Sequence, residues 1–215
     1  DGSEIILFGA VRRESPIAEE PMDVIVTVSG PSEPVTVRRK SRVAGIWVNT
    51  ASVEVDSAPS FYAVASSGPL GEILSETEDL RHKVSIGRAI RSVGAPQQIS
   101  DSQAFTEALI RLNVEAGLYE TLEDSVDVRE ETLFDTRIAL PANLREGDYA
   151  TRIFLTRDKQ VVDVYETVIF VQKVGLERFL YNLAHDQPLI YGLMSLFIAI
   201  VAGWGASTIF AYIRS

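Results

Sequence analysis

Residues 188–213 read PLIYGLMSLFIAIVAGWGASTIFAYI and contain no acidic or basic side chain. A helix of about 20 apolar residues is long enough to cross the hydrocarbon core of a bilayer, and tilt takes up any surplus length. We therefore predict one transmembrane helix over residues 188–213. The alternative is a buried core helix of a globular domain, which this length and composition disfavour.

Small side chains recur along this predicted helix, and their spacing places them on one face. A face of small residues lets a second helix approach closely, so that packing replaces contact with lipid. Trp204 lies too deep for the aromatic belt at the membrane surface and is better suited to contact with protein. We expect this face to pack against a partner, although glycine and alanine are also simply common in membrane helices. The expected packing residues are Ala199, Ala202, Gly203, Trp204, Ala206 and Ser207.

The segment before the span, residues 175–187, has apolar residues at helical spacing. It predicts a short amphipathic helix on the membrane surface, and continuous extension of the membrane helix is the alternative. Arg214 directly follows the span, so residues 214–215 are expected in the cytoplasm. The residues expected at the membrane interface are Leu176, Phe179, Leu180, Leu183, His185, Tyr191 and Arg214.

The numbering starts at Asp1 without a methionine, which we interpret as the result of signal-peptide removal rather than an artificial start. The domain before the span is then periplasmic in a bacterial inner membrane. The absence of cysteine suits that location, since no disulfide is needed. A net charge of −10 argues against nucleic acid as a partner.

Residues 1–174 are expected to form a mainly β domain. Residues 22–29 alternate between apolar and polar side chains, and a clearer hairpin is predicted over residues 149–171. Further short strands are expected at residues 35–37, 43–49, 52–55, 61–65 and 134–140. Seven or eight short strands favour an Ig-like antiparallel β-sandwich. The phrase from Leu144 to Tyr149 resembles a tyrosine corner, in which a tyrosine near the start of a late strand bonds back to the preceding loop.

A helical insert interrupts the strands at about residues 70–119. Its strongest helix is predicted over residues 102–118, with Ser100 as the N-cap and Gln103 as its reciprocal partner. A weaker helix is predicted over residues 76–91.

A basic cluster stands out in this acidic domain. It comprises Arg38, Arg39, Lys40 and Arg42, with Trp47 close behind. Strand alternation places Arg38 and Lys40 on one face and Arg39 on the other. Three interpretations stay open: a solvated hairpin end, a contact surface for an acidic partner or anionic headgroups, and a site for a small anion. Trp47 either lines such a surface or belongs to the core.

The sequence contains no pattern that indicates catalysis. His82 and His185 are the only histidines, and neither belongs to a zinc-binding or nucleophile motif. The acidic run of residues 123–131 lacks the order of a calcium-binding loop, so a solvated loop is the better interpretation. We expect no enzyme activity, no metal and no cofactor.

Several phrases together resemble the alphaproteobacterial putative transmembrane protein family. They are Val37–Lys40, Val43–Asn49, Pro59–Ser67, Glu107–Leu112, Gly117–Tyr119, Lys173–Glu177 and Ala184–Gly192. The resemblance implies an inner-membrane protein with a periplasmic domain, associated with sulfite- or sulfonate-exporter-like permeases. We therefore expect a non-catalytic accessory subunit whose partners are an integral membrane protein and the bilayer. The alternative is a membrane-tethered periplasmic binding module for a small anion.

Overall fold

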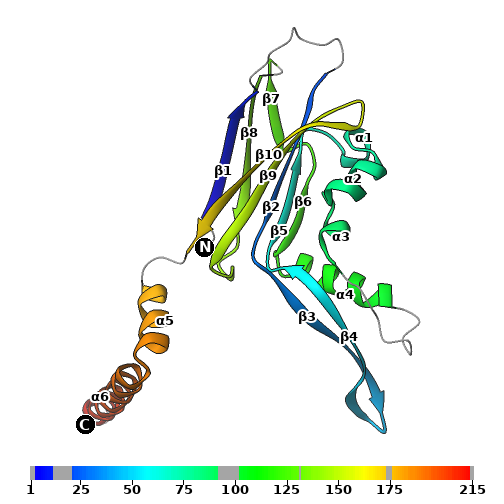
Figure 1. Ribbon diagram of the computed structural model, residues 1–215. Helices are drawn as coiled ribbons and strands as arrows, with labels where there is room; N and C mark the ends of the chain where they lie inside the picture. Colours follow the sequence, from blue (N-terminus) through cyan, green and yellow to red (C-terminus); the bar gives the residue numbers. More distant parts are fainter. Residues whose placement is uncertain (1–2, 12–20, 92–101, 131, 173–175, 214–215) are drawn as a thin grey trace. The chain divides into compact units, whose positions relative to one another are not determined.

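The computed structural model describes residues 3–11, 21–91, 102–130, 132–172 and 176–213 (Figure 1). Two compact units divide the chain, Asp1–Val171 and Gln172–Ser215. The first unit is mainly β, as predicted, and the second is helical.

A five-stranded sheet is built around β2 (Asp23–Ser29) and β5 (Tyr62–Ser66), which pair with each other. Both strands are buried along nearly their whole length. The apolar run of β5 is nearly continuous, and in β2 the apolar Ile25 interrupts the alternation that the sequence suggested, as is typical of strands covered on both faces. The strand order is β10-β9-β2-β5-β6, where β6 is Tyr119–Leu122, β9 is Gly147–Arg157 and β10 is Gln160–Val171.

A three-stranded sheet packs against one face of the five-stranded sheet, and the two sheets share an apolar core. This core joins Val24, Val26 and Ala63 of one sheet to Phe134 and Ile138 of the other. The strand order is β1-β8-β7, where β1 is Ser3–Ala10, β7 is Val126–Arg129 and β8 is Leu133–Leu140.

Helices cover the opposite face of the five-stranded sheet and form a second core. There, Ile25, Val64 and Phe154 pack with the helical residues Ile73 and Leu109. The helices are α1 (Leu70–Ile73), α2 (Glu76–His82), α3 (Ile86–Ala89) and α4 (Ser102–Glu115).

These helices form the connection between β5 and β6, and those two strands pair in parallel. A parallel pair needs such a crossover, because a tight hairpin can join only antiparallel strands. The fully antiparallel sandwich expected from the sequence is therefore wrong at this edge, whereas the helical insert is confirmed.

The helix predicted over residues 76–91 is interrupted at Lys83, whose φ of 53° is left-handed. The Asp79 carboxylate then accepts hydrogen bonds from the backbone N–H groups of Val84 and Ser85, at 3.1 and 2.7 Å. These bonds redirect the chain into α3. The helix predicted over residues 102–118 is confirmed as α4, while its expected N-cap, Ser100, lies outside the described residues.

The predicted tyrosine corner is present. The Tyr149 hydroxyl donates to the carbonyl oxygen of Arg145 at 2.7 Å, and Tyr149 lies near the start of β9. Gly147 has a φ of +144° in the turn, and a Cβ there would lie 2.7 Å from Pro31. The turn therefore requires glycine for both conformation and space.

The sequence pattern predicted separate short strands at residues 35–37, 43–49 and 52–55. The structure instead has two long strands, β3 (Ser32–Val43) and β4 (Ile46–Pro59), which pair as one hairpin. The turn at Ala44 and Gly45 divides the segment that was expected to be a single strand.

The second unit consists of α5 (Leu176–Asp186) and α6 (Pro188–Ile213). Only Gln187 separates them, and helical hydrogen bonding continues on both sides of it, from Gln187 N to Leu183 O and from Tyr191 N to Gln187 O. Helix α6 has 26 residues, or about 39 Å of helix. In the described part of the chain it is the one helix long and apolar enough to cross a membrane.

Candidate functional site

The β3–β4 hairpin, hereafter the arm, continues the central strand pair beyond the sheet (Figure 1). Two backbone hydrogen bonds carry the pairing through the bend: Gly30 N to Phe61 O at 2.8 Å, and Ser60 N to Pro31 O at 2.9 Å. The arm is therefore rooted in the most buried strands of the domain.

The root of the arm, which is the part nearest the sheet, packs against the domain. Val53 and Val55 are fully buried, and Val55 belongs to the core that includes Leu109 of α4. The Arg39 guanidinium lies 4.5 Å from the centre of the Phe105 ring, within the range of a cation–π contact. These contacts hold the arm against α4, and the Arg39 side chain takes part in this packing.

Beyond the root, an irregularity in the pairing lies between Arg39 and Lys40. The Ser41 and Thr50 hydroxyl groups are 3.0 Å apart just after it. Strand alternation puts Arg38, Lys40 and Arg42 on one face, opposite to that of Arg39. In the described parts of the chain, no ion pair joins these three residues to an acidic side chain.

The tip of the arm, residues 43–47, is apolar and exposed. Positive φ values at Ala44 and Gly45, 49° and 89°, are those that a two-residue type I′ turn requires. The exposed fractions of Val43, Ile46 and Trp47 are 51, 65 and 69 %. Trp47, which the sequence left as core or surface, is thus a surface residue paired across the ladder with Arg42.

The expected membrane residues lie on the helical unit. Ala199, Ala202, Gly203 and Trp204 are exposed on α6, and Tyr191 lies in its first turn. On α5, Leu180 is exposed and Leu183 half-buried, while the His185 ring stacks on that of Tyr181 with 4.1 Å between centroids. The side chains of Leu176, Phe179, Ala206 and Ser207, and all of Arg214, lie outside the described residues.

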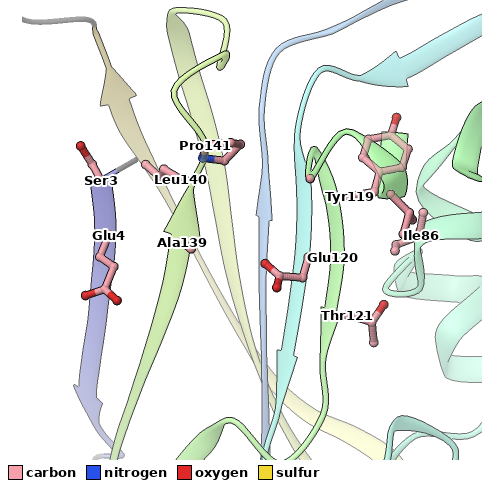
Figure 2. Close-up of a pocket in the computed structure, with 11 residues that line it drawn as sticks. Ser3, Glu4, Ile86, Tyr119, Glu120, Thr121, Ala139, Leu140 and Pro141 are labelled. Carbon is pink, nitrogen blue, oxygen red and sulfur yellow. The ribbon is translucent and has the colours of Figure 1, made fainter. Parts of the chain in front are cut away.

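A cavity of about 1060 Å³ lies along the free edge of β6. Figure 2 shows Glu120 and Thr121 on that strand, with Ser3, Glu4 and Ala139 across from them. Its only charged lining residues are two glutamates, so it favours cations over anions. A smaller apolar cavity of about 330 Å³ is lined by Phe8, Phe134 and Tyr165, among others. Neither cavity includes a residue of the basic cluster.

Sequence reasoning missed a polar cluster at the end of α2. The Arg152 guanidinium donates to the carbonyl oxygens of His82 and Lys83 at 2.6 and 3.1 Å, and the Tyr62 hydroxyl donates to that of Val84 at 2.8 Å. The His82 ring packs against that of Phe154, with 5.6 Å between the centroids. The cluster satisfies helix-end carbonyls and is therefore structural.

No metal site is formed by the described residues, where no group of three or more His, Cys, Asp or Glu side chains comes together. The candidate functional site of the first unit is therefore the arm, with its exposed basic and apolar side chains.

Burial raises the pKa values of Tyr62 and Tyr149, and raises that of Tyr119 to about 12, because the phenolate loses its hydration. The folded protein therefore holds phenol protons that the unfolded chain releases near pH 10. The stability contributed by these groups is complete below that pH and is lost as the pH rises towards 12.

We expect the denaturation midpoint to fall steeply from about pH 10 to about pH 12. Tyr119→Phe should remove part of this alkaline loss, and at neutral pH it should cost about 1 kcal/mol because the Pro59 carbonyl loses its donor at 2.7 Å. Tyr165→Phe, at a residue 62 % exposed, is the control. Urea titrations of the wild type and both variants across this pH range test the prediction. It fails if all three proteins lose stability in parallel.

One family model matches residues 1–212, and its description is "Putative transmembrane protein (Alph_Pro_TM)". No curated protein and no solved structure matches the chain.

Proposed function

Because the chain belongs to the Alph_Pro_TM family of transmembrane proteins, we propose that it is a non-catalytic, single-span accessory subunit of an inner-membrane protein complex. In this proposal α6 packs against helices of an integral membrane partner, and the mainly β domain docks on the partner's periplasmic side. A permease resembling sulfite or sulfonate exporters is the partner class that the family resemblance implies.

The observation that carries the proposal is the exposed small-residue face of α6. Ala199, Ala202 and Gly203 are all exposed in the isolated chain. A helix gains little from lipid contact at such residues, whereas close helix packing gives it van der Waals contacts that lipid does not supply.

The domain supports a binding role better than a catalytic one. Its polar cluster around Arg152 is bonded to helix-end carbonyls, and the lining of the cavity beside β6 includes two glutamates and no histidine. The tyrosine corner supports an Ig-like module, a class of domain that commonly serves recognition. Arg214 supports a cytoplasmic C-terminus.

The test compares Gly203→Phe with Val201→Phe, its matched control on the opposite face of α6. Each full-length variant is extracted from its native membrane in mild detergent, and what co-purifies is identified by mass spectrometry. Gly203→Phe should lose a partner that the wild type and Val201→Phe retain, because the added ring blocks close approach. A chain that always purifies alone would overturn the proposal.

The alternative, a tethered module for a small anion, has less support. Arg38, Lys40 and Arg42 lie along an exposed strand, and none of them lines the cavities described above. Calorimetry of the full chain in detergent with sulfite, sulfate and taurine tests this alternative, and heat of binding below millimolar ligand would revive it.

A further inference from the structure

The end of the arm combines two kinds of side chain that suit one surface. Strand alternation places Arg38, Lys40 and Arg42 on one face of β3, and the exposed apolar residues Val43, Ile46 and Trp47 complete the tip. Aliphatic and indole side chains enter the boundary between headgroups and acyl chains, while lysine and arginine remain among anionic headgroups. The domain is otherwise strongly acidic, so this positive end is a local exception.

The arm also leaves the sheet at the end from which the chain continues to the helical unit. Ser29, the last residue of β2, pairs with Ala150, and Ala150 pairs with Val168 near the end of β10. The root of the arm and the exit of β10 at Val171 therefore lie at the same end of the five-stranded sheet. The exposed residues Val168 and Phe170 add apolar surface at this end.

The lengths are compatible with contact between the tip and a membrane crossed by α6. Residues 172–175 can span at most about 14 Å, and the 11 residues of α5 add about 17 Å. With Gln187 between the two helices included, the exit of β10 is therefore held within about 35 Å of the start of α6. The 12 residues of β3 extend about 40 Å, which exceeds that limit.

We propose that the tip of the arm is a second membrane-attachment element, which inserts Val43, Ile46 and Trp47 into an anionic lipid surface while Arg38, Lys40 and Arg42 bind its headgroups. The inference rests on the membrane span of the proposed function but not on its protein partner. Two attachments would orient the domain on the bilayer, as a single span cannot.

The test uses the full chain with Trp204→Phe, which leaves Trp47 as the only tryptophan. The protein is reconstituted into vesicles of phosphatidylcholine alone, or mixed with phosphatidylglycerol, with and without brominated acyl chains. In the anionic vesicles Trp47 emission should shift to the blue and be quenched by bromine. The effect should weaken as salt rises from about 0.1 to about 1 M.

Arg38→Gln/Lys40→Gln/Arg42→Gln should reduce the ratio of inserted to free tips on the order of a hundredfold. The matched control, Arg81→Gln/Arg88→Gln/Arg111→Gln, removes the same charge from helices α2, α3 and α4 and should leave quenching unchanged. Circular dichroism checks that both variants keep the β structure.

Unquenched Trp47 in both kinds of vesicle, equal quenching in both, or quenching that survives the arm triple variant would each overturn the inference. So would a Trp47 that is shielded in native membranes but free in vesicles, since the tip would then bind a protein. The vesicles contain no partner, so each vesicle result leaves the co-purification test of the proposed function intact.

Discussion

Arginine at both Phe197 and Ile200 is expected to release the chain from the membrane. Both residues lie near the middle of α6 and are exposed in the isolated chain. Each arginine at the centre of a span costs about 2.5–3.5 kcal/mol on insertion scales, and the apolar gain of the original residue is lost as well. The pair therefore opposes insertion by about 6 kcal/mol or more, equivalent to over four orders of magnitude.

The measurement is the division of full-length protein between pellet and supernatant after a carbonate wash of membranes. Phe197→Leu/Ile200→Leu is the control, because it changes the same positions and keeps the helix apolar. If the arginine variant stays in the pellet as fully as the control, a segment other than α6 holds the chain.

Phe154→Ala should have the largest effect on the β domain. Phe154 is fully buried on the interior strand β9 and packs in the core between sheet and helices. The His82 ring and the Arg152 guanidinium also rest against it, at 5.6 and 5.1 Å from its centre. Removing the ring leaves a cavity that these neighbours cannot fill, so we expect a loss of about 3–5 kcal/mol.

Urea denaturation of the full chain in detergent, followed by circular dichroism of the β structure, measures this loss. The control is Phe170→Ala on the neighbouring strand β10, where the ring is 64 % exposed and the change should stay within about 0.5 kcal/mol. Equal midpoints for the two variants would mean that the core between sheet and helices does not hold the domain together.

Local features were predictable from the sequence. The helix α6 follows from an unbroken apolar run, and α4 follows from apolar residues at helical spacing. The tyrosine corner also follows, since the hydroxyl of Tyr149 and the carbonyl of Arg145 are only four residues apart. In each case the pattern and the contact lie within a few consecutive residues.

Features that depend on distant pairing were not predictable. The parallel pairing of β5 with β6 joins strands separated by four helices, and nothing in the short sequence of β6 distinguishes it from an antiparallel strand. The cluster of Arg152, Tyr62 and His82 brings together three remote parts of the chain.

The candidate site was predictable in composition but not in shape. Alternation separated Arg39 from Arg38 and Lys40, and the contact of Arg39 with the Phe105 ring agrees with that separation. The alternation of polar and apolar residues broke down in the arm, because its outer half has no core to face. Trp47 was therefore ambiguous: an exposed tryptophan on a projecting hairpin and a buried one in a sheet have the same local sequence.

Cross-linking mass spectrometry in native membranes tests the proposed accessory-subunit role most directly. A photoreactive residue is placed at Ala199 on the small-residue face, and a second protein carries it at Phe197 on another side of α6. We predict that Ala199 captures one integral membrane protein repeatedly and that Phe197 captures mainly lipid. Lipid adducts alone at both positions would contradict the proposed function.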